Sequence, residues 1–294
     1  EAETAMHRAK KEHVAHLVFE AHMHADNIRD REIEEMLPRA LQEKAITMEY
    51  QAVRSLQENR VVGYEALARW RQSKVGFISP VDFVRVATES GQMADLTRYV
   101  LRTSCNEFQA LLAEDKRLYL AVNVSVGDLY SADFCQHLDQ ILSETNFPAD
   151  QLVLEVTEDL SLNNVEGVRV MLNDLRQRGL RISIDDFGTG YSSMRYLSSY
   201  TIDTLKIDRS FVQDILTNES NQKIVRAIVS MGNDLGLSVI TEGVEHMEQA
   251  RLLHRLGCIL IQGFAFSRPQ PIHLSLESFK REYLRADLYS KMID

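Results

Sequence analysis

The segment Arg181-Ile182-Ser183-Ile184-Asp185-Asp186-Phe187-Gly188-Thr189-Gly190-Tyr191 decides how this chain folds. Residues 181–184 alternate polar and apolar side chains, as a short strand does. Two adjacent aspartates and a glycine-containing turn follow them. Adjacent carboxylates at a strand end repel each other unless a cation or strong hydrogen-bond donors compensate them. Taken alone, the segment is explained equally well by an acidic surface turn, because Asp and Gly are common turn residues.

On both sides of this segment, strand-like and helical patterns alternate along the chain. We expect strands at 46–53, 61–68, 118–124, 152–156, 182–185, 204–207, 237–240 and 258–261. We expect helices at 80–90, 93–113, 128–144, 164–178, 192–199, 219–235, 246–256 and 274–288. Repeated strand–helix units predict parallel strands with helical crossovers, and eight such strands fit a TIM-type (β/α)8 barrel.

The first two strands are joined by a short polar turn at residues 58–60, which predicts a hairpin and therefore one antiparallel strand. An open doubly wound sheet is the alternative fold. It would normally carry a GxGxxG phosphate loop after its first strand, and the sequence has none there.

The domain organisation follows from the same patterns. We predict one barrel domain over residues 45–294, because no proline- or serine-rich linker interrupts it. Apolar residues at helical spacing predict a linker helix within 26–44, centred on residues 27–43. Residues 1–25 are interpreted as a remnant of an upstream domain. Their clustered histidines, His13, His16, His22 and His24, have no ligand spacing that favours a metal site over a solvated or packed segment.

Composition excludes several functions. The chain of 294 residues carries a formal net charge of -10 and no basic run, which argues against a nucleic-acid polymer as partner. No apolar run is long enough to span a bilayer, and no signal peptide is recognisable. The three scattered cysteines favour a reducing compartment. We therefore expect a cytoplasmic protein, or the cytoplasmic part of a membrane-anchored parent.

Polar side chains gather where the predicted strands end, which is where active sites of such barrels lie. In chain order they are Glu65, Arg69, Asn123, Ser125, Glu155, Thr157, Glu158, Asp185, Asp186, Lys206, Asp208, Glu242, Glu245 and Gln262. The carboxylates of Glu65, Glu155, Asp185, Asp186 and Glu242, the ammonium of Lys206 and two divalent cations would together have zero formal charge. Oxygen ligands without His or Cys favour Mg²⁺ or Mn²⁺, and a shared Asp185 would hold two ions about 3.5–4 Å apart.

These residues stand in motifs that resemble the EAL-domain cyclic-di-GMP phosphodiesterases. The name-giving motif is Glu65-Ala66-Leu67, and six more follow in the family's order. They are Asn-Val-Ser at 123–125, Glu-Val-Thr-Glu at 155–158, Asp-Asp-Phe-Gly-Thr-Gly-Tyr-Ser-Ser at 185–193, Leu-Lys-Ile-Asp at 205–208, Glu-Gly-Val-Glu at 242–245 and Gln-Gly-Phe at 262–264. The residues Ala-Met-His-Arg-Ala-Lys at 5–10 resemble the end of a GGDEF domain, which implies a GGDEF–EAL tandem parent.

The resemblance implies hydrolysis of cyclic di-GMP to linear pGpG by a water activated between two metal ions. It assigns one ion to Glu65, Asn123, Glu155 and Asp185, and the other to Asp185, Asp186 and Glu242. It makes Lys206 the group that orients the water and Glu158 the residue that fixes the loop after Asp186. It places Gln51, Leu67, Arg69, Asp208, Glu245 and Gln262 along the substrate. It also implies a homodimer through the loop 187–193 and the following helix.

Two departures from the family pattern are visible. Ala52 replaces a usual proline, with little expected effect. Ile259 replaces a usual acid, which would lower substrate affinity if that acid supports the loop around Gln262. Two other functions remain open: a receptor that binds cyclic di-GMP without cleaving it, and an unrelated metal-dependent barrel enzyme. The complete set of acidic ligands and Lys206 favours the phosphodiesterase over both.

Overall fold

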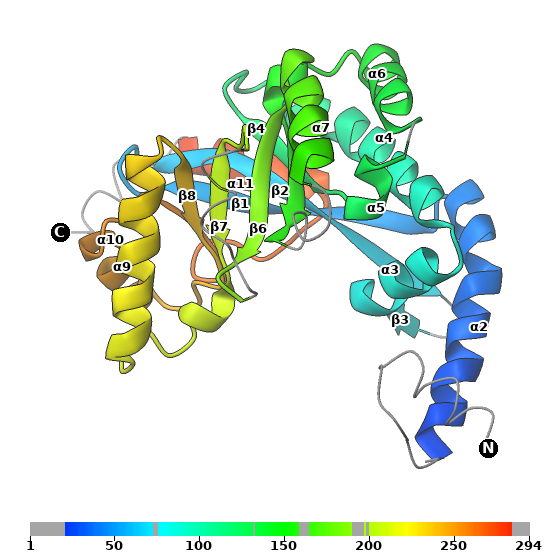
Figure 1. Ribbon diagram of the computed structural model, residues 1–294, viewed down its shortest axis with the longest axis horizontal. Helices are drawn as coiled ribbons and strands as arrows, with labels where there is room; N and C mark the ends of the chain where they lie inside the picture. Colours follow the sequence, from blue (N-terminus) through cyan, green and yellow to red (C-terminus); the bar gives the residue numbers. More distant parts are fainter. Residues whose placement is uncertain are drawn as a thin grey trace. The chain divides into compact units, whose positions relative to one another are not determined.

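The computed structural model describes residues 21–72, 76–131, 133–158, 165–189, 197 and 200–283. By its contacts the chain divides into two compact units. The first comprises Glu1–Thr47 and Ala68–Leu96, and the second comprises Met48–Leu67 and Thr97–Asp294. Figure 1 gives the element labels. Among the described residues, no helix combines the length and the apolar character that crossing a membrane requires.

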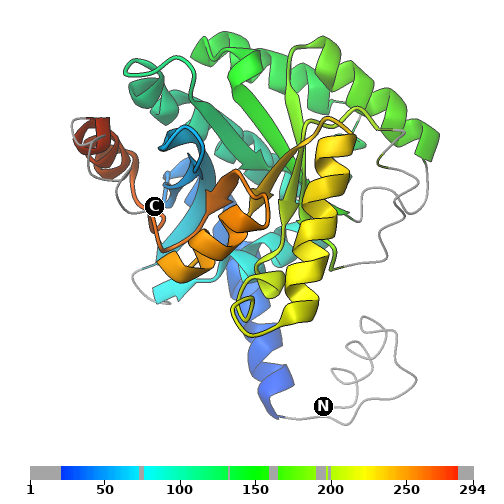
Figure 2. The same cartoon turned by 90° about the vertical axis from the view of Figure 1, so that its left-hand side faces the viewer.

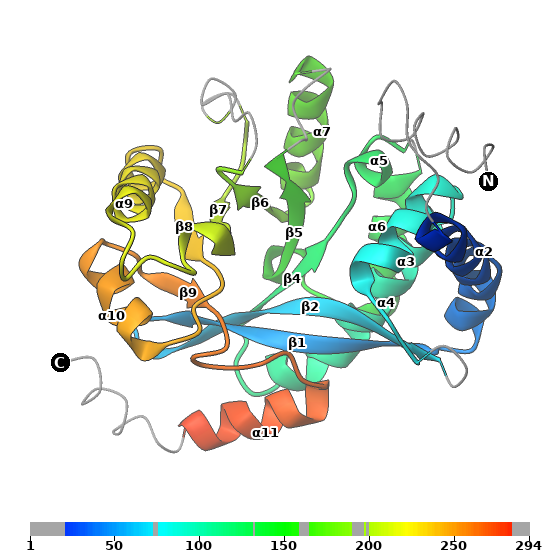
Figure 3. The same ribbon diagram turned by 90° about the horizontal axis from the view of Figure 1, so that it is seen from below.

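The second unit contains the predicted barrel. Its strands are β1 (Ile46–Ser55), β2 (Arg60–Gln72), β4 (Tyr119–Asn123), β5 (Leu152–Thr157), β6 (Arg181–Phe187), β7 (Thr204–Ile207), β8 (Ser238–Thr241) and β9 (Leu260–Gln262). They pair in the order β1-β9-β8-β7-β6-β5-β4-β2, and an additional pairing of β1 with β2 closes the sheet (Figure 3). The pairs from β2 through β4 to β9 are parallel, whereas β1 is antiparallel to β9. The predicted barrel with one reversed strand is confirmed.

Helices follow the strands and lie outside them, as α9 and α10 do in Figure 2. They are α4 (Met93–Leu112), α5 (Val126–Leu129), α6 (Phe134–Thr145), α7 (Val165–Gln177), α9 (Glu219–Asp234), α10 (Met247–Arg255) and α11 (Ile272–Tyr283), with 3-10 turns η1 (Ala149–Gln151) and η3 (Arg209–Phe211). Because they cover the sheet, β5 is buried on both faces except at its last residue. Position 63 on β2 needs a glycine because an aromatic ring lies close to it. A Cβ on Gly63 would lie 2.5 Å from the ring of Tyr119.

One helix prediction is wrong, because the predicted single helix is interrupted. The pattern at 128–144 predicts a single helix, but the structure has two, α5 and α6. The buried Leu129 and Phe134 are five residues apart, which interrupts the spacing of three or four that one helix face needs. Ser125 caps the start of α5 by accepting a hydrogen bond from the Asp128 backbone N–H, so this short helix has an N-terminus of its own before α6 begins.

The first unit is a small helical layer with one short strand. It contains α2 (Ala21–Gln42), β3 (Gly76–Ile78) and α3 (Pro80–Glu89). Ile33 and Leu37 of α2 and Phe83 of α3 are fully buried, and the Arg85 guanidinium donates to both carboxylate oxygens of Asp30 at 2.5 and 2.8 Å. The helix predicted at 27–43 is therefore present and begins earlier than expected, at Ala21. The strand β3, antiparallel to the end of β2, was not predicted because three residues carry too short a pattern.

Some predictions lie outside the described residues. These are the remnant at residues 1–20, most of the helix at 192–199, and the part of the proposed dimer loop after Thr189. The two clustered histidines in the first turn of α2, His22 and His24, lie where only the backbone is described. The boundaries of the linker and of a single barrel domain stay predictions.

Candidate metal centre

The carboxyl ends of the parallel strands bring the acidic side chains to one rim of the barrel. In the sheet register, Asn123 at the end of β4 stands beside Glu155 of β5, and Thr157 of β5 stands beside Asp185 of β6. Glu65 lies on β2 and Lys206 on β7, and each is buried. Because these strands run in the same direction, residues near their ends meet although they are far apart in sequence.

Lys206 is the centre of the cluster. Its side chain is 1% exposed, and its Nζ lies 2.6 Å from Glu242 Oε1, 2.9 Å from Glu155 Oε2, 3.2 Å from Asp185 Oδ1 and 3.5 Å from Glu65 Oε2. Burial alone would lower the pKa of this ammonium, but the four carboxylates outweigh it and hold the pKa well above its usual value. Lys206 is therefore a protonated, fully buried cation with only hydrogen bonds to donate.

Two amides hold Glu65 in place. Asn123 Nδ2 donates to Glu65 Oε1 at 2.7 Å, and Gln262 Nε2 donates to Glu65 Oε2 at 2.6 Å. Burial raises the pKa of Glu65, but the charge of Lys206 and these hydrogen bonds lower it by more, so its pKa lies below the usual value. Glu65 is thus ionised and oriented. Gln262 Nε2 also donates to Gln51 Oε1 at 3.2 Å, which joins β9 to β1.

The other carboxylates carry more negative charge than one lysine compensates. Burial raises the pKa of Glu155 well above its usual value despite Lys206, and Glu65, Asp185 and Glu242 add to the rise. Burial likewise raises the pKa of Glu242 to about 8, with Lys206 opposing and Asp185 contributing. In the absence of further cations, the cluster retains protons near neutral pH.

Asp186 stands at an irregular point of its strand. The pairing of β6 with β7 shifts register between Ile184 and Phe187, and Asp186 has a φ of +53°, in the left-handed region that Asp tolerates better than most residues. The irregularity turns Asp186 toward solvent, while its backbone N–H donates to Asp185 Oδ1 at 2.9 Å. Burial, the charge of Asp185 and the charge of Asp208 raise the pKa of Asp186 to about 6.

These side chains form two groups that could hold a metal ion. Glu65, Glu155 and Asp185 offer oxygen atoms that all lie within 4.8 Å of one another, and so do Asp185, Asp186 and Glu242. Asp185 belongs to both groups. The excess of negative charge and the all-oxygen donors match the preference of hard cations.

A hydrogen bond joins two rim loops. Glu158, directly after β5, accepts at Oε2 from the backbone N–H of Gly188 at 2.9 Å. Gly188 has a φ of +98°, and a Cβ there would lie 3.0 Å from the Phe211 ring, so a larger residue would displace the loop. The residue after β5 is thereby connected to the segment that directly follows Asp186.

Comparison with known proteins decides the family. Residues 34–269 match the EAL domain family. The chain belongs to that family. This EAL domain is 38% identical over 256 residues to the cyclic di-GMP phosphodiesterase NbdA of Pseudomonas aeruginosa, and 38% identical over 240 residues to the signaling protein YkoW of Bacillus subtilis. These alignments cover 87% and 81% of the chain but only 33% and 30% of the relatives. The chain thus spans about a third of their length.

Solved structures agree with the fold of this EAL domain. The PaMucR phosphodiesterase in complex with c-di-GMP superposes with a TM-score of 0.79 at 33% identity, covering 83% of this chain and 99% of that one. The EAL enzyme Bd1971 in its cAMP- and cyclic-di-GMP-bound form superposes with a TM-score of 0.79 at 29% identity, covering 86% and 69%.

The other residues of the EAL domain that are predicted to contact the substrate differ in their burial and in their distance from the cluster around Lys206. Leu67 is half-buried on β2, whereas Arg69, two residues further along that strand, belongs to the first unit. Asp208 accepts from the Ser210 backbone N–H at 3.0 Å and interacts with Asp186. The side chain of Glu245 is exposed. The acidic residues and Lys206 therefore meet in one cluster, which Glu245 does not join.

Sequence reasoning missed Ser267 in this EAL domain. Its backbone carbonyl accepts from Gln51 Nε2 at 3.1 Å, and its Oγ accepts from the Ala52 backbone N–H at 3.1 Å. The second bond needs the N–H that the usual proline lacks, so the departure at Ala52 adds a hydrogen bond. Ile259, the other departure, has a 41% exposed side chain, and Gln262 takes its own contacts from Gln51 and Glu65. No local signal marks Ser267.

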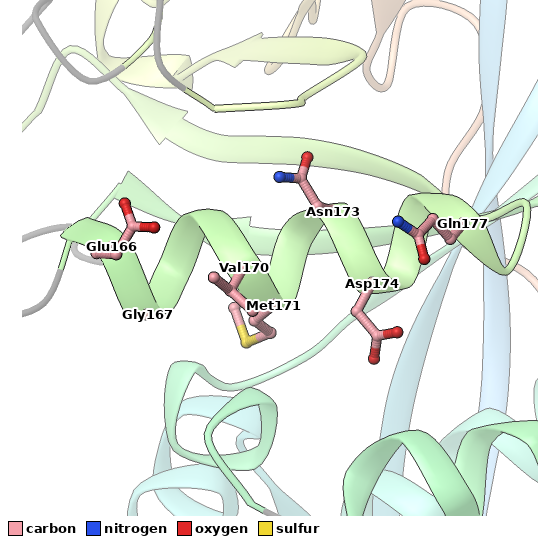
Figure 4. A pocket seen from close by; sticks show the side chains of 7 residues that line it. All are labelled: Glu166, Gly167, Val170, Met171, Asn173, Asp174 and Gln177. Atoms are coloured by element: carbon pink, nitrogen blue, oxygen red, sulfur yellow. The ribbon is translucent and has the colours of Figure 1, made fainter.

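A hollow of about 620 Å³ lies elsewhere, along α7 (Figure 4). The described residues that line it run from Glu166 to Gln177 on that helix. None of the clustered carboxylates contributes to it, so the hollow is separate from the candidate metal centre.

Proposed function

We propose that this EAL domain is a phosphodiesterase that hydrolyses one phosphodiester bond of cyclic di-GMP to give linear pGpG. The observation that carries the proposal is the pair of acidic groups sharing Asp185, arranged around the protonated Lys206. Membership of the EAL family and similarity to proteins named as cyclic di-GMP phosphodiesterases support the same substrate.

The proposed cofactors are two Mg²⁺ or Mn²⁺ ions. One would be held by Glu65, Asn123, Glu155 and Asp185, and the other by Asp185, Asp186 and Glu242. When bound, such ions neutralise carboxylate charge and lower the pKa of water, which is the chemistry that hydrolysis of a phosphodiester needs. The raised pKa values of Glu155 and Glu242 support the need for added positive charge at this rim.

In the proposed reaction, a water oxygen forms a bond to phosphorus and the bond from phosphorus to the ribose 3′ oxygen breaks. The 3′ oxygen leaves with the electron pair of that bond and takes up one proton, the attacking water gives up one proton, and the product carries a 5′ phosphate. Lys206 is protonated and faces the carboxylates, so it can donate a hydrogen bond to the attacking water and stabilise the charge that develops on phosphate oxygens. Asn123 and Gln262 keep Glu65 oriented through both of its oxygens.

Glu158 is proposed as a positioning residue for the same reaction. It acts through the Gly188 backbone N–H, which follows Asp186 by two residues. Holding that N–H restrains the irregular end of β6 and therefore the direction of the Asp186 carboxylate. The substrate itself would lie along Gln51, Leu67, Arg69, Asp208, Glu245 and Gln262.

The wider context is proposed on the sequence resemblance. We infer a GGDEF–EAL tandem parent, with residues 1–25 as the end of the upstream domain, 26–44 as a linker helix and 45–294 as the barrel domain. We infer a homodimer through residues 187–193 and the helix that follows, and a cytoplasmic location for this part of the protein. That the chain spans about a third of its relatives is consistent with further domains in the parent.

Incubation of the purified protein with cyclic di-GMP and either Mg²⁺ or Mn²⁺ tests the function, with nucleotides separated by chromatography. We expect pGpG to accumulate, and we expect no turnover with a chelator or in Glu65→Ala. The matched control is Glu166→Ala, since the Glu166 side chain is 70% exposed and pairs only with Arg169 in the contacts described. Binding without turnover under both metals would instead identify a receptor that does not cleave its ligand.

A further inference from the structure

The predicted metal ligand Asn123 lies at the end of β4, where packing does little to hold its side chain. The residue is exposed, whereas its hydrogen-bond partner Glu65 is buried and accepts from Asn123 Nδ2 at 2.7 Å. Because this bond uses the amide nitrogen, it leaves the amide oxygen available to a cation. The direction of that oxygen therefore depends on how firmly the backbone around Asn123 is held.

The backbone directly after Asn123 is fixed at two successive residues. The Val124 N–H donates to the Glu155 carbonyl oxygen at 2.9 Å, and Ser125 is the N-cap of α5. In that position Ser125 has an extended backbone, and its Oγ accepts from the Asp128 N–H at 3.1 Å. Since a cap needs its hydroxyl in one place, any contact that holds this hydroxyl also holds the chain two residues after Asn123.

A buried carboxylate makes that contact. Asp128 is 6% exposed, and its Oδ2 accepts from Ser125 Oγ at 2.7 Å and from Thr97 Oγ1 at 2.6 Å. Thr97 lies on α4 and is buried as well. A carboxylate only accepts hydrogen bonds, so it can bind both hydroxyl groups at once. Because a buried charge without these donors is unfavourable, the three side chains keep one arrangement and connect the start of α5 to α4.

The helix α5 depends on such contacts for its position. It has four residues, and a helix of that length gains little from its own hydrogen bonds. If Ser125 moved, the strand end that carries Asn123 would move with it. The side chains of Glu65 and Glu155 are buried in the barrel and would stay in place. Loss of the network around Asp128 would therefore separate one predicted ligand from the others.

We propose that Asp128, held by Thr97, is a positioning residue for the candidate metal centre, because it fixes Ser125 and thereby the direction of the Asn123 amide. This inference rests on the proposed function, in which Asn123 binds a metal ion. It adds Thr97 and Asp128, which lie outside the motifs shared with the family, to the residues that determine metal affinity.

Calorimetric titration of the full chain with Mn²⁺, without nucleotide, measures this effect. We expect Asp128→Ala to lower Mn²⁺ affinity about 10- to 100-fold, the range for losing a group that orients a metal ligand. Thr97→Val keeps the side-chain shape and should lower the affinity about fivefold, which corresponds to one hydrogen bond. Thr145→Val is the matched control and should leave the affinity unchanged, because Thr145 is also buried but donates to the Ile141 carbonyl within α6 at 2.7 Å.

A double-variant cycle separates positioning from a general loss of stability. Asp128→Ala is measured again in the background of Asn123→Ala. If Asp128 acts through the Asn123 amide, the second change should alter Mn²⁺ affinity by less than about twofold, since the group that it positions is already absent. A role in stability alone would lower the affinity by the same factor in both backgrounds.

The Asn123 side-chain amide gives a reading that needs no metal. In chelator, its resonance in a nitrogen-15 NMR spectrum is identified by its loss in Asn123→Ala. Donation to the Glu65 carboxylate is a charge-assisted hydrogen bond, so the resonance should shift when the amide changes direction. We expect a shift in Thr97→Val and in Asp128→Ala, and none in Thr145→Val.

Unchanged Mn²⁺ affinity in Thr97→Val and Asp128→Ala, equal losses in both backgrounds of the cycle, or an unmoved amide resonance would each overturn the inference and leave the proposed function standing. A wild type that binds Mn²⁺ but does not cleave cyclic di-GMP would contradict the proposed function alone. If the wild type binds no Mn²⁺, the proposed function fails, and the amide resonance still decides whether Asp128 positions Asn123.

Discussion

Replacing Lys206 by methionine keeps the side-chain length and removes a cation that faces four carboxylates. Its Nζ lies between 2.6 and 3.5 Å from them, and the side chain is 1% exposed. Removing one partner of a buried ion pair costs about 3–5 kcal/mol, because the remaining charge is left uncompensated. We therefore expect Lys206→Met to lower the free energy of unfolding in chelator by about 3–5 kcal/mol.

Divalent cations should reverse most of this loss, since they supply the positive charge that the variant lacks. With saturating Mg²⁺ we expect the difference from wild type to fall to about 1 kcal/mol, the typical net contribution of a lost hydrogen bond. Turnover should nevertheless fall about 100- to 1,000-fold, because a bound ion would not replace the hydrogen bond that Lys206 is proposed to donate during the reaction.

Urea unfolding of both proteins, with chelator and with Mg²⁺, measures these differences. Lys280→Met is the matched control: Lys280 is 51% exposed and pairs with Glu114 at 2.9 Å, so its loss should cost less than about 1 kcal/mol in either condition. The reasoning is refuted if Lys206→Met is no less stable than this control in chelator, or if Mg²⁺ leaves its deficit unchanged.

Three further outcomes follow from the same contacts. Glu158→Ala removes the acceptor of the Gly188 N–H and should weaken metal affinity about 10- to 100-fold, as measured by calorimetry. Unchanged metal affinity in this variant would contradict the positioning role of Glu158. The metal-free protein should lose stability as pH rises from about 5 to 8, since the pKa of Glu242 is about 8 when folded and near 4.5 when unfolded. Over that interval the folded protein holds a proton that the unfolded chain has released, so rising pH favours unfolding. Urea midpoints should fall in wild type and stay flatter in Glu242→Gln. Gly63→Ala should lower the free energy of unfolding by about 1–3 kcal/mol, because the new Cβ would meet the Tyr119 ring. Adding Tyr119→Leu to this variant should restore the urea midpoint. Additive losses in the double variant would argue against this packing.

The barrel was predictable because its signals are local and repeated. Most parallel strands are short apolar runs, most crossovers in the described part of the chain are helices with one apolar face, and polar residues stand at or near the strand ends. Since parallel strands align their carboxyl ends, Glu65, Asp185 and Lys206 could be assigned to one rim without coordinates. The excess of negative charge at Asp185 and Asp186 then indicated a cation-binding site.

Other features were missed because their signal is one irregular spacing or a contact between residues far apart in the sequence. The break between α5 and α6 arises from one irregular spacing, Leu129 to Phe134, inside an otherwise helical segment. The contact of Ser267 with Gln51 joins residues 216 positions apart. The left-handed backbone of Asp186 follows from a register shift between β6 and β7, which depends on how two strands pair.

The irregular end of β6 also gives the two adjacent aspartates, Asp185 and Asp186, different orientations. Asp185 faces Lys206 inside the cluster, whereas the left-handed backbone at Asp186 turns the next carboxylate toward solvent. The two adjacent carboxylates thus approach the candidate metal centre from different directions. This division is consistent with one carboxylate shared between two cations and its neighbour bound to only one.

The most direct test of the central claim is mass spectrometry of the product formed from cyclic di-GMP in water enriched in the heavy oxygen isotope, with Mg²⁺ or Mn²⁺ present. Metal-activated hydrolysis at this acidic rim predicts linear pGpG with one heavy oxygen in its 5′ phosphate, and no product in chelator or in Glu65→Ala. Intact cyclic di-GMP under both metals, or product formation that persists in Glu65→Ala, would contradict the claim.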